Sequence, residues 1–218
     1  MRLVFAAMLF VFVYPTIAQE KARLENIRTV RGQTLSSSTL PQLKLKFDKA
    51  FKYVGGHTFI LYDVARAEQH FFVDADKGGN VSRFYWIQFE GYLPSNAHKY
   101  DYNSPKTVNI GGLDFFADAY AIKIDPKQGR PDSDGNRARE FLVSKGFKTA
   151  SDEVMMQRLV HMIDKENRTE LMLIYLEVLT PTAFTSADLS INGKANEKWP
   201  SISDGLLQRA ISGFTIVR

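Results

Sequence analysis

The feature that most constrains the fold is an alternation of apolar and polar side chains with a period of two. It is clearest where Leu43, Leu45 and Phe47 alternate with lysines. A strand with one buried face has this period, because successive side chains point to opposite sides. The glycine pair Gly55-Gly56 then predicts a tight hairpin turn. Further strands are expected over residues 58–64, 69–75, 84–94, 106–124, 153–164, 169–179 and 214–217.

Two helical patterns accompany these strands. Ser133 precedes a helical pattern over 136–145, and Ser203 precedes a second one over 204–212. Serine is a common helix N-cap because its side chain accepts a hydrogen bond from a free backbone N–H. No run of strand-helix-strand crossovers is evident. We therefore expect a single α+β domain: one curved, mostly antiparallel sheet of about seven strands, with the two helices packed on one face.

The N-terminus predicts export. A positive Met1-Arg2 precedes an apolar run over 3–14, and small residues end at Ala18, so residues 1–18 have the pattern of a signal peptide. The apolar run is shorter than the roughly 20 residues of a membrane-spanning helix, so we expect no transmembrane anchor after cleavage. An uncleaved N-terminal anchor is the alternative. The expected location is periplasmic or extracellular.

After removal of the predicted signal peptide, the composition of the remaining chain indicates two parts. Residues 19–41 are poor in apolar side chains and are expected to form an extended or poorly ordered leader, with the domain over 42–218. Without Arg2, 27 Lys and Arg stand against 24 Asp and Glu, a net charge of +3. This excess is too small to predict a nucleic-acid partner.

Neither a metal nor a cofactor is predicted. The chain has no cysteine, which excludes a thiolate metal site and a Cys nucleophile. The four histidines lack the spacing of metal ligands. The segment 132–136 looks briefly like a calcium loop, but Arg137 and Val143 occupy the positions where that loop needs Gly and Glu. No glycine-rich phosphate loop is present. Asn80 and Asn167 match the N-glycosylation pattern, which has meaning only in a eukaryote.

The strand over 84–94 carries polar groups among aromatic rings. Trp86, Gln88 and Glu90 share one face by parity, and the other face is apolar. A buried, unpaired carboxylate costs several kcal/mol, so Glu90 must be solvated or paired. The hairpin of 153–164 and 169–179 is similarly divided. A turn centred near 166–167 sets Gln157 opposite Glu177, and places Leu159 opposite Tyr175 and His161 opposite Leu173.

We therefore hypothesise that the two mixed faces meet on the concave side of the sheet and line a pocket. Its ligand-binding residues would be Trp86, Gln88, Glu90, Gln157, His161, Tyr175 and Glu177. Pockets for small molecules are mainly apolar with a few placed polar groups. The alternative is an ordinary solvated face of an antiparallel sheet.

Three functions remain open. The leading hypothesis is an exported, non-enzymatic domain that binds a small apolar or amphipathic ligand on the concave face. The second is a hydrolase or isomerase in which Glu90 or Glu177 forms an acid-base pair with His161. The third is an envelope protein-interaction module that binds another protein through the leader and the sheet edges.

Overall fold

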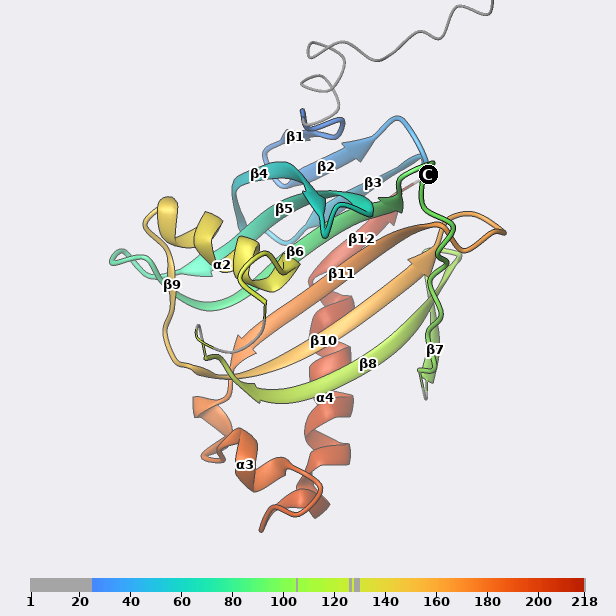
Figure 1. Cartoon of the computed structure of the whole chain (residues 1–218). Helices are drawn as coiled ribbons and strands as arrows, with labels where there is room; N and C mark the ends of the chain where they lie inside the picture. The colour runs from blue at the N-terminus through green and yellow to red at the C-terminus, as the bar shows by residue number, and fades with distance from the viewer. Residues whose placement is uncertain (1–24, 105, 126, 128–129, 218) are drawn as a thin grey trace, which may run out of the picture.

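The computed structural model describes residues 25–104, 106–125, 127 and 130–217, and its main element is a curved eight-stranded sheet (Figure 1). In spatial order its strands are β4 (Lys52–Leu61), β5 (Ala65–Ala75), β6 (Asn80–Tyr92), β11 (Thr169–Val178), β10 (Glu153–Met162), β8 (Leu113–Lys123) and β7 (Lys106–Ile110). All these neighbours are antiparallel, and a short β9 (Lys148–Thr149) adds a parallel pairing to β6. The predicted α+β class with a mostly antiparallel sheet is confirmed.

A second, four-stranded sheet includes part of the predicted leader. Its order is β1 (Thr29–Arg31), β2 (Thr34–Ser37), β3 (Leu43–Phe47) and β12 (Phe214–Val217). The described part of the leader, from Glu25, is therefore extended but paired into the fold rather than separate from it. The reason is packing: Leu35 is fully buried and lies opposite Leu45 of β3. Residues 1–24, which include the predicted signal peptide, lie outside the described residues.

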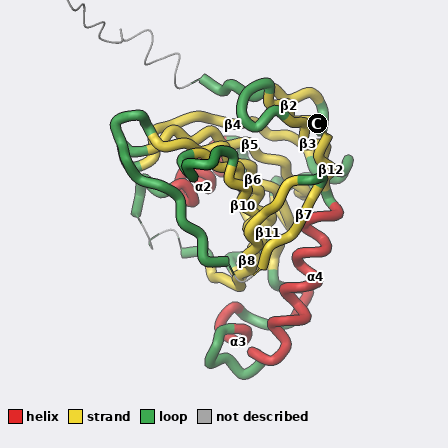
Figure 2. Tube along the Cα trace, turned by 90° about the vertical axis from the view of Figure 1, so that its right-hand side faces the viewer, coloured by secondary structure: helices red, strands yellow, loops and turns green. Residues whose placement is uncertain are grey.

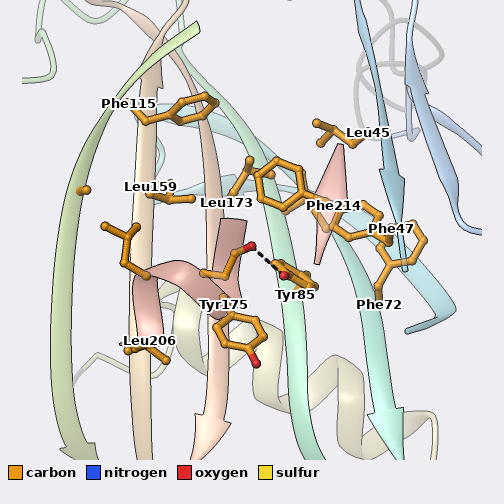
Figure 3. Close-up of a cluster of buried hydrophobic side chains, with 14 of the residues drawn as sticks. Leu45, Phe47, Phe72, Tyr85, Phe115, Leu159, Leu173, Tyr175, Leu206 and Phe214 are labelled. Atoms are coloured by element: carbon orange, nitrogen blue, oxygen red, sulfur yellow. Dashed lines mark hydrogen bonds between the residues drawn. The ribbon is translucent and has the colours of Figure 1, made fainter. Parts of the chain in front are cut away.

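The smaller sheet and helix α4 (Trp199–Ser212) cover one face of the large sheet, here called the convex face. The core between them is rich in aromatic rings (Figure 3). Phe47 of β3 stacks on Phe72 of β5, with ring centroids 4.2 Å apart. Tyr85 of β6 donates a 2.7 Å hydrogen bond to the backbone oxygen of Ala210 (dashed in Figure 3), which ties α4 to the sheet.

Helix α2 (Asp134–Ser144) covers the opposite, concave face (Figure 2). Ser133 caps it as predicted, accepting a hydrogen bond from the backbone of Asn136. Ala138 and Leu142 pack against β6 and β11 residues of a second core cluster. The expectation that both helices share one face is therefore corrected: each face carries one long helix. Both faces of the central strands carry apolar side chains that must be shielded from water, and one helix can pack on only one face.

The positions of one turn and of one helix start differ most from the sequence-based expectation. Gly55 and Gly56 lie inside β4 rather than in a hairpin turn, and a β-bulge falls between Tyr53 and Gly55, which has φ 124°. The chain reverses instead at Tyr62 and Asp63, both with positive φ. Helix α4 also begins at Trp199, earlier than predicted.

The remaining helical elements are short: α3 (Ser186–Leu189) and 3₁₀ turns at Thr180–Thr182 and Asn196–Lys198. Figure 1 shows α3 beyond the end of the large sheet, near the start of α4. Within the described residues, no helix has the length and apolar composition needed to cross a bilayer.

Candidate functional site

The seven predicted ligand-binding residues are divided between the two faces of the large sheet. Trp86, Gln88 and Glu90 of β6 lie on the concave face, beside the cluster that α2 covers. The hairpin residues lie on the convex face. They are Gln157, His161, Tyr175 and Glu177. The hypothesis of one pocket built from all seven is therefore wrong.

The division follows from strand register. In the hairpin, Gln157 is opposite Tyr175 and Glu177 is opposite Met155, so the predicted pairing is shifted by two residues. A shift of two preserves the faces within the hairpin. The register between β11 of the hairpin and β6 is independent of the register within the hairpin. In that pairing Trp86 is opposite Ile174. The mixed face of β6 therefore continues into the apolar face of the hairpin.

The four convex-face residues make structural contacts. Tyr175 donates a 2.6 Å hydrogen bond to Glu177, which forms an ion pair with Arg209 of α4. Gln157 is buried and donates to the backbone oxygen of Asp118 at 2.9 Å. The ring of His161 hydrogen-bonds the backbone oxygen of Asp114 at 2.9 Å. These contacts hold α4 and β8 against the hairpin.

The predicted acid-base pair is not assembled. Glu90 and His161 lie on opposite faces of the sheet. Glu177 shares a face with His161, but His161 is opposite Leu171, six positions along β11 from Glu177. At about 3.3 Å per residue, the two side chains start roughly 20 Å apart. Acid-base catalysis needs groups within hydrogen-bond reach of one substrate, about 3 Å.

A cavity of about 740 Å³ lies between α2 and the concave face. Its floor is apolar and comes from β6 and β11: Val81, Phe84, Trp86, Met172, Ile174 and Leu176. Ala138 and Leu142 of α2 form the opposite wall. Small-molecule sites commonly have volumes of about 300–1,000 Å³ and apolar linings with a few polar groups. Trp86 is thus in the position predicted for a ligand-contacting ring.

A chain of hydrogen bonds runs from Trp86 away from the cavity. The indole N–H of Trp86 donates to Gln88 Oε1 at 3.1 Å, and the side-chain amide of Gln69 donates to the same oxygen at 2.7 Å. Gln88 in turn donates to Glu90 at 2.5 Å. Tyr100 donates to the other oxygen of Glu90 at 2.8 Å. Because every member has a partner, the network fixes the orientation of the Trp86 ring.

Glu90 is directly opposite Glu170 of β11, and both carboxyl groups are buried. Tyr102 donates a 2.6 Å hydrogen bond to Glu170. Burial raises the pKa of Glu90 to about 7, and the charge of Asp134 adds to this increase. Burial also raises the pKa of Glu170 to about 8, with the charge of Glu90 contributing. Two neighbouring buried carboxyl groups resist simultaneous ionisation, so the pair retains protons near neutral pH.

Charged side chains line the part of the cavity wall near this pair. Arg158 of β10 forms a 2.7 Å ion pair with Asp118 and lies over the ring of Tyr102. Asp134, at the start of α2, also lines the cavity, and burial raises its pKa. No group of three or more His, Asp or Glu side chains among the described residues is arranged to hold a metal ion.

Sequence reasoning missed Glu170, Asp134 and Arg158 as residues of this region. A signal for Glu170 was present: it is the only carboxylate on its face of β11, which otherwise carries Met172, Ile174 and Leu176. Asp134 follows the Ser133 cap and is the first residue of α2. Its place over the sheet depends on where α2 docks, which a local pattern does not encode.

No family model, curated protein or solved structure matches this chain. The class of protein is therefore defined by the fold and the cavity alone: an α+β domain with a partly enclosed apolar cavity between a helix and a curved antiparallel sheet.

Proposed function

We propose that this is an exported, non-enzymatic protein that binds a small amphipathic ligand in the cavity between α2 and the concave face. The observation that carries the proposal is the cavity itself, with Trp86 on its floor and polar groups along one side. Its apolar floor favours a hydrocarbon segment, because removing apolar surface from water contributes about 25 cal/mol per Å². Support for export comes from the signal-peptide pattern of residues 1–18.

The state of the polar groups supports binding over catalysis. The Glu90 and Glu170 side chains are 7% and 1% exposed, and tyrosine hydroxyls cover both. Neither residue lines the cavity. A ligand on the cavity floor meets the indole of Trp86 and the methyl and methylene groups around it, which favour a hydrocarbon chain.

Fluorescence of Trp86 tests the proposal. The chain has two tryptophans, so Trp199→Phe leaves Trp86 as the only one. Titration of this variant with dodecanol and with dodecanoate, below their micelle concentrations, is expected to change the intensity and wavelength of emission saturably. No saturable change with either amphiphile would contradict the proposal.

Two substitutions locate the binding site. Ala138→Phe places a ring in the cavity and is expected to weaken binding at least tenfold. Ala97→Phe makes the same change in an exposed loop outside the cavity and is expected to leave affinity unchanged. Because Val143 lines the cavity and is 54% exposed, Val143→Phe obstructs the cavity mouth without disturbing the core and leaves Trp86 as the only tryptophan. Equal affinities for all three variants would place the ligand elsewhere.

A further inference from the structure

The cavity carries two arginines whose hydrogen-bonding capacity is not fully used. Arg139 of α2 and Arg158 of β10 both line it. The Nε of each is buried and has no hydrogen-bond partner. Most buried N–H groups in proteins have a partner, so both side chains keep unused hydrogen-bonding capacity beside the cavity.

Arg139 differs from Arg158 in its electrostatic surroundings. Arg158 is ion-paired with Asp118. Arg139 forms no ion pair with any acidic side chain in the part of the chain that the structure describes. The third arginine of this kind, Arg137, lies over the ring of Phe59 and does not line the cavity. Arg139 is thus the cavity-lining guanidinium that lacks a counter-ion.

The other charges of the lining leave this positive site uncompensated. Four basic residues line the cavity, Lys123, Arg139, Lys148 and Arg158, against three aspartates, Asp125, Asp134 and Asp152. Asp152 forms an ion pair with Lys123. Burial raises the pKa of Asp134 and so disfavours its charged form. The lining therefore favours a ligand with negative charge.

We propose that the ligand is an anionic amphiphile whose carboxylate is bound by the Arg139 guanidinium, with its hydrocarbon segment on the Trp86 floor. A planar guanidinium presents paired N–H donors that match the two oxygens of a carboxylate. The apolar floor and the unpaired arginine then serve the two ends of the same molecule. This inference rests on the proposed function and adds the chemical class of the ligand.

Three ligands with the same chain and different head groups test the inference: dodecanoate, dodecanol and dodecyltrimethylammonium. Their affinities for the Trp199→Phe protein are measured by Trp86 emission. Dodecanoate is expected to bind at least tenfold more tightly than the other two, because hydrogen bonds to charged groups are the stronger ones. In Arg139→Gln the ratio of dodecanoate affinity to dodecanol affinity is expected to fall about tenfold. Arg139→Lys is expected to retain part of the preference for dodecanoate.

Arg137→Gln is the matched control, since it removes one positive charge from the same helix at a side chain outside the cavity. It is expected to keep the preference for dodecanoate. Equal affinities for dodecanoate and dodecanol, or an equal loss in the Arg137 and Arg139 variants, would overturn the head-group assignment while leaving the proposed function intact. Failure of all three ligands to bind would overturn both.

Discussion

Glu90 and Glu170 lie directly opposite each other on β6 and β11, and both are buried beneath tyrosine side chains. Each has a pKa raised above that of an ordinary glutamate, chiefly by burial. The folded state therefore holds protons that the unfolded chain releases. When the pH is below the pKa of an ordinary glutamate, both carboxyl groups are protonated in the folded and the unfolded chain. As the pH rises from there through the raised pKa values of the folded state, the free energy of unfolding decreases.

The first prediction is a decrease in folding stability between about pH 4.5 and pH 8 that depends on this pair. Because one pKa unit corresponds to about 1.4 kcal/mol, Glu170→Gln should be more stable than the wild type at pH 8.5 by on the order of 2 kcal/mol. At pH 5 the two proteins should be similar. Urea unfolding at a series of pH values measures this difference.

The matched control is Glu166→Gln in the exposed turn between β10 and β11, which should follow the wild-type pH dependence. If Glu170→Gln also followed the wild type from pH 5 to pH 8.5, the buried pair would not retain its protons.

The second prediction concerns Glu68 of β5, whose pKa is lowered, in contrast to the raised pKa values of Glu90 and Glu170. Burial alone would raise its pKa, but hydrogen bonds from His70 and from the backbone of Arg28 and Ile27, with the Arg28 charge, lower it to about 2. Its contribution is present above the ordinary glutamate pKa and is lost as pH falls toward 2. Glu68→Gln should destabilise the protein by roughly 3 kcal/mol at pH 7, measured by urea unfolding.

The same substitution should release the N-terminal segment, because Glu68 holds the backbone of Ile27 and Arg28. Faster hydrogen exchange before β1 is the expected sign. Glu140→Gln on the exposed side of α2 should change neither quantity. Unchanged exchange in Glu68→Gln would show that other contacts hold this segment.

The third prediction separates the two faces of the sheet. His161→Gln, on the convex face, should leave amphiphile affinity unchanged, because His161 contacts the backbone of Asp114 and does not line the cavity. Trp86→Leu should weaken binding about tenfold, a loss of roughly 1.4 kcal/mol. Displacement of a fluorescent amphiphile measures both variants. A larger effect from His161→Gln would place the ligand on the convex face.

The fourth prediction is cleavage of the signal peptide. The mature protein, purified from its source, should begin at Gln19, directly after Ala18. N-terminal sequencing and intact mass measure the cleavage site. A chain that retains Met1 would contradict export by signal cleavage and would favour the uncleaved anchor.

Strand patterns predicted the class of fold because period-two alternation is a local property. Leu43, Leu45 and Phe47 are all buried, as their spacing predicts. The Ser133 cap was equally local, since one side chain contacts the start of its own helix. The two strands at 29–37 were not predicted, because Leu35 is buried by β3 rather than by its own segment. Deletion of residues 20–41 would therefore remove part of the core, including Leu35.

The candidate site could be predicted only in part. Parity correctly placed Trp86, Gln88 and Glu90 on one face, because side chains alternate within a single strand. Relating that strand to the hairpin required the register between β6 and β11, where a shift by one residue exchanges the faces. The cavity also depends on α2, whose docking brings Arg139 over the sheet. No periodicity within the helix specifies that contact.

A crystal structure with a brominated ligand tests the central claim most directly. The protein would be co-crystallised with dodecanoate that carries bromine at the end of its chain, and the bromine would be located by anomalous scattering. We expect one main bromine position inside the cavity, among Trp86, Ile174 and Leu142, with the carboxylate at Arg139. A main bromine position on the convex face, or no ordered bromine in crystals of a saturated complex, would contradict the account.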